Sequence, residues 1–128
     1  NRAKELTDGG ADVVIDPVGG WYSQAVLRAT TFGARFVVVG FASGEIPRIP
    51  LNLVLLKGTI VRGFEIRTLA QHLPDEVARD HRELLELFAA GKLRPYVSAV
   101  HPLGETAAAL RSMLDRTATG KVLIAPRA

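Results

Sequence analysis

Three short apolar segments, each followed by glycine, constrain the fold of this 128-residue chain more than any other feature. They span residues 11–16, 34–39 and 59–62. Each is rich in β-branched or other apolar residues, which is typical of a strand buried on both faces of a parallel sheet. In the stretches between these segments, apolar residues recur at the spacing of a helix. Because apolar strands that alternate with helices form parallel sheets with right-handed crossovers, we expect an α/β fold.

Glycine and proline mark the ends of the predicted helices in the first half of the chain. Gly9 ends a helix that is already under way at the first residue, and residues 21–31 form a helix that Gly33 closes. Residues 41–50 contain two prolines and predict a loop. Asn52 is expected to cap a short helix over 53–57, which Gly58 ends.

The second half predicts two more helices and two more strands. Pro74 suits the first position of a long helix, and its apolar stripe ends at Gly91. Strands are expected over 95–100 and 121–125. Between them a second helical stripe is formed by four residues, which are Leu103, Ala107, Leu110 and Leu114.

Composition excludes several classes of protein. With 48% hydrophobic residues the chain can bury a modest core of one domain at most. It lacks the run of about 18 apolar residues that a membrane span needs, so we expect an intracellular, cytoplasmic protein. There is no cysteine for a disulfide or a thiolate metal site, and the net charge of +3 comes without a dense basic run, which argues against nucleic-acid binding. The chain opens on Asn1 without an initiator methionine, so we expect a fragment.

The glycines that follow the three strands predict a ligand cleft. Gly19, Gly40 and Gly63 should lie at one edge of the sheet, because the carboxyl ends of parallel strands meet there. Glycine at such an edge lets backbone approach a ligand closely. For any single glycine a simple turn is the better interpretation. For the three glycines together, a ligand cleft and three separate turns are equally good interpretations.

Three further features near the expected edge allow two interpretations each. Asp16, at the end of a buried strand, should accept backbone N–H bonds from a neighbouring loop, with a ligand hydroxyl as the alternative. The segment from Phe41 to Gly44 offers an aromatic face and free N–H groups to a flat ring, or it is an exposed turn with Phe41 in the core. Lys121 either begins a solvated strand or contacts a cofactor phosphate.

The usual catalytic motifs are missing. There is no G-x-G-x-x-G, and Ser43 lacks the following helix that a G-x-S-x-G nucleophile needs. His72, His81 and His101 are too far apart in sequence for a metal-ligand motif, so surface positions are the default. We therefore predict no catalytic residue and no metal ligand in this chain.

Four collinear segments resemble the medium-chain dehydrogenase/reductase superfamily. They span residues 11–20, 33–41, 51–58 and 119–124, and they are most similar to the zinc-independent, NADPH-dependent quinone oxidoreductases. The resemblance implies the second half of a Rossmann-type doubly wound parallel sheet over residues 1–92. Residues 93–128 would then be a strand-helix-strand return to a catalytic domain that is missing here. The glycine-rich phosphate loop and the substrate pocket would lie upstream.

The resemblance also implies a function and a set of contacts. The parent would be an enzyme that transfers hydride from NADPH to a quinone or enone, while the isolated fragment would be inactive. The implied contacts to NADP come from eight residues, which are Val18, Gly19, Gly40, Phe41, Ala42, Gly63, Phe64 and, more weakly, Lys121.

An exposed edge strand implies a partner. In the family the strand that corresponds to residues 59–64 pairs with its copy, so we expect a homodimer through Ile60, Val61 and Arg62. Three other interpretations stay open: a fragment of a zinc alcohol dehydrogenase, an enoyl-reductase segment of a synthase, and an inactive assembly module.

Overall fold

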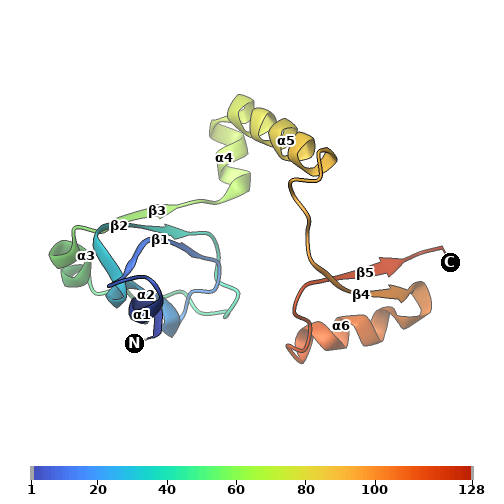
Figure 1. The fold of residues 1–128 in the computed structure, drawn as a ribbon, viewed down its shortest axis with the longest axis horizontal. Coiled ribbons are helices and arrows are strands. Elements are labelled where there is room, and N and C mark those ends of the chain that lie inside the picture. The colour runs from blue at the N-terminus through green and yellow to red at the C-terminus, as the bar shows by residue number, and fades with distance from the viewer. Residues whose placement is uncertain (1, 128) are drawn as a thin grey trace. The chain divides into compact units, whose positions relative to one another are not determined.

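A computed structural model describes residues 2–127, which form two compact units that divide between Val77 and Ala78. The first unit holds α1 (Arg2–Leu6), β1 (Ala11–Asp16), α2 (Trp21–Arg28), β2 (Thr30–Val38), α3 (Leu51–Lys57), β3 (Ile60–Gly63) and α4 (Ile66–His72), as labelled in Figure 1. Helix α5 (Pro74–Ala89) begins in it and continues into the second. The second unit then holds β4 (Val97–Pro102), the 3₁₀ turn η1 (Leu103–Glu105), α6 (Thr106–Leu114) and β5 (Lys121–Ala125). No helix within residues 2–127 has the length and apolar character to cross a membrane.

The first unit is built on a parallel sheet in the order β1-β2-β3. Asp16 at the end of β1 is level with Val38 in β2, and Val38 is level with Gly63 at the end of β3. The three strands therefore end at one edge. This confirms the predicted α/β class and the parallel direction of its strands.

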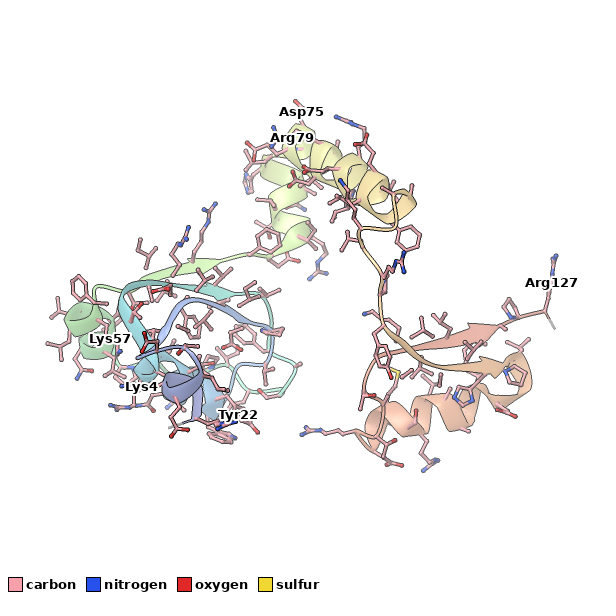
Figure 2. The ribbon with its side chains drawn as sticks, in the orientation of Figure 1. Lys4, Tyr22, Lys57, Asp75, Arg79 and Arg127 are labelled. Atoms are coloured by element: carbon pink, nitrogen blue, oxygen red, sulfur yellow. The ribbon has the colours of Figure 1, made fainter. Side chains whose placement is uncertain are left out.

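The core of the first unit lies between β2 and the helices that pack on it. Leu27 of α2 and Phe36 of β2 are fully buried. Lys57, labelled in Figure 2, reaches from α3 to the carbonyl oxygen of Thr30, with Nζ and O 2.5 Å apart. The expected burial of β1 on both faces is wrong for this chain, because Val13 and Ile15 are exposed. Nothing among the described residues covers that side of the strand.

The boundary between α2 and β2 differs from the prediction. The helix ends at Arg28 rather than at residue 31, and β2 begins at Thr30, four residues before the predicted start. The cause is early pairing with β1, since the Ala11 amide donates to the carbonyl of Ala29 at 3.1 Å. Gly33 does not close the helix. It lies inside β2 with φ of +75°, where the register with β1 slips.

Two other predicted boundaries shift. Helix α3 begins at Leu51 with Pro50 as its N-cap residue, so Asn52 lies inside the helix and does not cap it. Proline at this position already holds its φ at −65°, which favours an earlier start. Gly58 ends the helix in left-handed geometry as predicted, and β3 then runs one residue later than expected.

The second unit is a β-α-β arrangement with little core. Strands β4 and β5 pair in parallel, β5 has its predicted bounds, and β4 begins two residues later than expected. The predicted apolar stripe of α6 does not face a core, because Leu110 is 57% and Leu114 81% exposed while Ala109 is the buried residue of this helix. The division of the parent into domains at 92/93 stays a prediction.

Candidate functional site

The carboxyl ends of β1 and β2 are tied together by backbone hydrogen bonds. The amides of Val39 and Gly40 both donate to the carbonyl oxygen of Asp16, at 2.9 and 3.3 Å. The Phe64 amide donates to the Val38 carbonyl at 2.8 Å and fixes the end of β3 in the same way. Gly40 and Gly63 therefore lie at one edge of the sheet, as the sequence predicted.

Asp16 organises the loop that follows β1. Its Oδ1 accepts hydrogen bonds from the amides of Val18 and Gly19 at 3.0 and 2.9 Å, and its Oδ2 accepts from the Ser23 hydroxyl at 2.5 Å. Burial would raise the pKa of this carboxyl, but the three hydrogen bonds outweigh it and lower the pKa below its ordinary value of 3.8. The backbone interpretation of Asp16 is thus confirmed, with Ser23 as an additional donor.

Gly19 is required by the packing of the chain itself. Its φ is +70°, and a Cβ added to it would lie 2.7 Å from Cδ1 of Phe41. Any larger residue would strain the backbone and displace the Phe41 ring. The turn interpretation is sufficient for this glycine.

Gly63 has no comparable structural requirement. Its φ lies outside the left-handed region, and a Cβ added there would meet no described atom within 4 Å. Gly40 is intermediate, with ordinary φ and the carbonyl oxygen of Pro17 at 3.4 Å from an added Cβ. The fold therefore tolerates a side chain at Gly63, and the open space beside it can hold a ligand.

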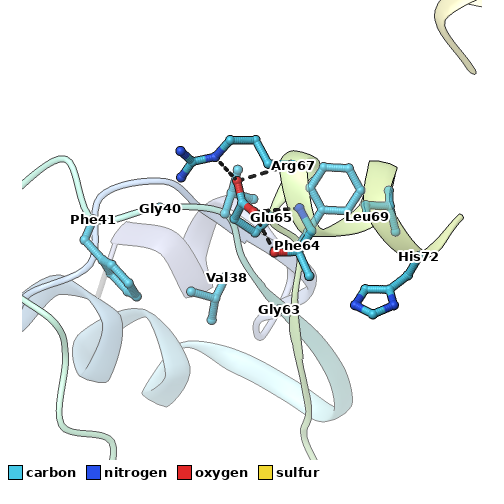
Figure 3. A pocket seen from close by; sticks show the side chains of 11 residues that line it. Val38, Gly40, Phe41, Gly63, Phe64, Glu65, Arg67, Leu69 and His72 are labelled. Carbon is cyan, nitrogen blue, oxygen red and sulfur yellow. Dashed lines mark hydrogen bonds and ion pairs between the residues drawn. The ribbon is translucent and has the colours of Figure 1, made fainter. Parts of the chain in front are cut away.

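A pocket of about 710 Å³ opens at this edge of the sheet. Figure 3 shows it between the ends of β2 and β3 and helix α4. Its lining is largely apolar and consists of Val38, Val39, Gly40, Phe41, Gly63, Phe64, Glu65, Arg67, Thr68, Leu69 and His72. An apolar pocket with a few polar groups is the usual form of a small-molecule site.

In the loop after β2, Phe41 lines the pocket and does not lie in the core. The Phe41 ring packs on Gly19 and also lines the pocket, and the side chain stays 41% exposed. The expectation of free N–H groups in this loop is wrong at three positions, however. The Ala42 and Ser43 amides donate to the carbonyls of Pro17 and Val18 at 3.0 and 2.9 Å, and the Gly44 amide donates back to Phe41. These bonds hold the loops after β1 and β2 together.

Helix α4 forms a wall of the pocket that the sequence analysis missed. Four lining residues recur at the i, i+3, i+4 and i+7 spacing of one helix face, and they are Glu65, Thr68, Leu69 and His72. That spacing was readable in the sequence. It was overlooked because the segment is short and begins at a glutamate, a less common capping residue than serine or aspartate.

Glu65 caps α4. Its carboxylate accepts from the Thr68 amide at 2.8 Å, from the Thr68 hydroxyl at 2.8 Å, and from Nε and the amide of Arg67 at 3.0 and 3.2 Å. The hydrogen bonds from Thr68 and Arg67 lower the pKa of Glu65 from 4.5 to about 2. Glu65 is therefore a carboxylate at neutral pH, and its lone pairs are engaged by α4 itself.

The structure gathers part of the predicted contact set. Gly40, Phe41, Gly63 and Phe64 line the pocket. Val18, Gly19 and Ala42 belong to the two interlocked loops, whereas Lys121 begins β5 in the other unit. That these eight residues contact a cofactor stays a prediction.

The described residues offer no metal centre. Residues 2–127 contain no group of three or more histidine, aspartate or glutamate side chains that could hold a metal ion, and the sequence has no cysteine. The residues that the structure describes therefore do not fit a zinc site.

Comparison with known proteins gives the family. Residues 1–124 match the family described as zinc-binding dehydrogenase. The chain is 39% identical over 126 residues to the quinone oxidoreductase-like protein 2 homolog of Nematostella vectensis, covering 97% of this chain and 34% of that protein. It is 36% identical over 121 residues to quinone oxidoreductase-like protein 2 of Bos taurus, covering 94% and 35%.

The solved structures agree on the fold. A mycobacterial protein solved in complex with NADPH superposes with a TM-score of 0.79, at 21% identity, over 98% of this chain and 38% of that one. Because of the family match over residues 1–124 and the curated relatives at 39% and 36% identity, the chain belongs to the zinc-binding dehydrogenase family, and its resemblance to the medium-chain dehydrogenase/reductase superfamily is confirmed. It spans about a third of the length of the curated relatives it matches.

Proposed function

We propose that this chain forms one wall of the NADP site of an oxidoreductase that transfers hydride from NADPH to a quinone or enone. The observation that carries the proposal is the alignment of Asp16, Val38 and Gly63 at one sheet edge, with an open pocket beside Gly40 and Gly63. Ligands of open α/β sheets bind beyond the carboxyl ends of the strands. The names of the relatives support the reaction class.

The residues of the pocket fit a nicotinamide. Gly40 and Gly63 leave backbone accessible, and the Phe41 ring and Phe64 supply apolar surface for a flat ring. The cofactor would supply the hydride, while this chain would position the ring and exclude water from one side of it. Val18, Gly19 and Ala42 would support the same ring through the interlocked loops.

Gly63→Ala in the full-length protein tests the proposal. The added methyl group has room in the fold but enters the pocket, so we expect the dissociation constant for NADPH to rise about tenfold, which corresponds to about 1.4 kcal/mol. The measurement is titration of NADPH fluorescence, with thermal unfolding as the check on folding.

Gly104→Ala is the matched control. Gly104 also has ordinary φ and open space around an added Cβ, but it lies in η1, outside the residues that line the pocket. It should leave NADPH affinity unchanged. Equal affinity for NADPH in wild type and in Gly63→Ala would contradict the assignment of this pocket to the cofactor.

The isolated 128-residue chain should bind NADPH weakly or not at all. It contains no glycine-rich phosphate loop, and the phosphates account for much of the affinity for a dinucleotide. Submicromolar binding by the isolated chain would show that the proposed division of the site between this chain and the rest of the protein is wrong.

We also propose that β3 pairs with its copy in a homodimer. Every residue of β3 is exposed, and among the described strands β3 pairs only with β2, so its outer edge has unpaired backbone groups. Val61→Pro would remove a backbone donor and should shift the full-length protein toward monomer in sedimentation. A wild-type protein that sediments as a monomer would contradict this pairing.

A further inference from the structure

We propose that His72 is a catalytic residue of the pocket, where its imidazole donates a hydrogen bond and then a proton to the substrate as hydride arrives. This inference rests on the proposed function and extends it. The sequence analysis assigned His72 to the surface by default, because His72, His81 and His101 are too far apart in sequence for a metal-ligand motif. The structure places it at the pocket.

The position of His72 follows from α4. The helix is held at its start by Glu65 and near its end by the bond from the Leu73 amide to the Leu69 carbonyl, at 2.7 Å. Leu69 and His72 lie on the helix face that lines the pocket, and Figure 3 shows the His72 ring at the end of α4 away from Glu65. The side chain is thus attached to a defined helix rather than to a loop.

The imidazole of His72 is available for a ligand. Among residues 2–127 no hydrogen bond or ion pair engages it, whereas Nδ1 of His101 lies 3.1 Å from a carboxylate oxygen of Glu105. His72 is also exposed, so water can return a proton to it after each turnover.

Elimination among the other pocket groups favours His72 as the acid. Glu65 has its pKa lowered to about 2 and its oxygens accept four hydrogen bonds, so it has no proton to give at neutral pH. The guanidinium of Arg67 does not release a proton in proteins. The residues that line the pocket from β2 and β3 carry no charge, and the nearest acids farther along the chain are Asp75 and Glu76 in the first turn of α5.

A proton donor beside the substrate oxygen has a defined role in this reaction. When hydride adds to one end of the conjugated system of a quinone or enone, its π bond breaks and negative charge develops on oxygen. Protonated His72 donates its N–H proton to that oxygen, and the new O–H bond forms as the N–H bond breaks. Neutral imidazole then takes a proton from water. One proton is consumed for each NADPH oxidised, so atoms and charge balance.

Two variants of the full-length protein separate binding from proton transfer. His72→Leu removes the donor, and His72→Gln keeps an N–H donor that cannot act as an acid. With 1,4-naphthoquinone as substrate, both should lower kcat by about 10²-fold, the usual scale for a general acid, with little change in the affinity for NADPH. His81→Leu on α5 is the control, because His81 is exposed and lies outside the pocket lining.

A second measurement does not depend on turnover. The dissociation constant of 2-naphthol, a ring hydroxyl that cannot be reduced, is measured with NADP⁺ present. It should rise about tenfold in His72→Leu and return to near wild type in His72→Gln, the scale expected for one lost hydrogen bond.

The outcomes distinguish the two proposals. A wild-type protein that does not bind NADPH would overturn the proposed function. A protein that binds and oxidises NADPH, but whose two His72 variants match His81→Leu in kcat and in 2-naphthol affinity, would overturn the role of His72 alone.

Discussion

Each of the two units of the chain contains a β-α-β arrangement, but the two arrangements differ in what they bury. In the first unit, β1-α2-β2 encloses Leu27 and Phe36 with no exposed surface. In the second, β4-α6-β5 buries Ala109 while Leu110 and Leu114 remain largely exposed. Both units have parallel strands joined through a helix.

The difference shows that an apolar helical stripe does not by itself specify a core. The first unit adds β3 and α3 to its β-α-β arrangement, and α3 packs on the central strand β2. The second unit has only two strands and α6, which is too little surface to enclose large side chains. The stripe of α6 is therefore apolar surface that a further segment or a partner could cover.

The largest expected effect tests where the core lies. Phe36→Ala should lower the free energy of unfolding of the chain by about 3–5 kcal/mol, because it opens a cavity at a fully buried site. Leu114→Ala in the second unit should change it by no more than about 0.5 kcal/mol. Urea unfolding followed by far-UV circular dichroism measures both. A large cost for Leu114→Ala would mean that the stripe of α6 is covered in solution.

A smaller effect is expected at the loop after β1. Asp16→Ala removes the acceptor of three hydrogen bonds and should cost about 1–3 kcal/mol, which the same unfolding experiment measures. Asp12→Ala in the same strand is the control. The exposed Asp12 carboxylate accepts one hydrogen bond, from the Thr31 hydroxyl at 2.7 Å, so a smaller cost is expected.

The pH dependence of this effect has a defined sign. The folded-state pKa of Asp16 lies below 3.8. The contribution of its carboxylate to the free energy of unfolding is therefore fully present above pH 3.8 and is lost as the pH falls through the folded pKa. The gap in unfolding free energy between wild type and Asp16→Ala should therefore close below about pH 4. A gap that widens on acidification would contradict the hydrogen-bonded carboxylate.

The smallest effect is local to α4. Glu65→Ala should leave the core intact and increase hydrogen exchange at the amides of Arg67 and Thr68, which lose their acceptor. The same fraying should appear in wild type as pH falls from 4.5 toward 2, since the lowered pKa means that the cap is lost on protonation. Glu83→Ala on α5 serves as control, and unchanged exchange at Arg67 and Thr68 would argue against the cap.

Much of the sheet edge could be predicted from the sequence. The bounds of β1 and β5, the left-handed end of α3 at Gly58 and the shared edge of Gly40 and Gly63 all follow from local patterns. Apolar β-branched runs, glycine and proline act through their own backbone preferences, and these are present in the residues themselves. That local information sufficed for the fold class and for the position of the pocket's sheet wall.

Other features were decided by contacts between distant segments. Pairing of Ala29 and Thr30 with β1 extended β2 past Gly33, and the Phe41 ring, not a ligand, accounts for Gly19. Helix α4 brought His72 to the pocket, a placement that depends on where a chain turns after β3. The sequence determined which residues favour strands, helices and turns, because these preferences act over a few bonds. Which faces are buried and which side chains meet at the pocket depended on three-dimensional packing, which no local pattern contains.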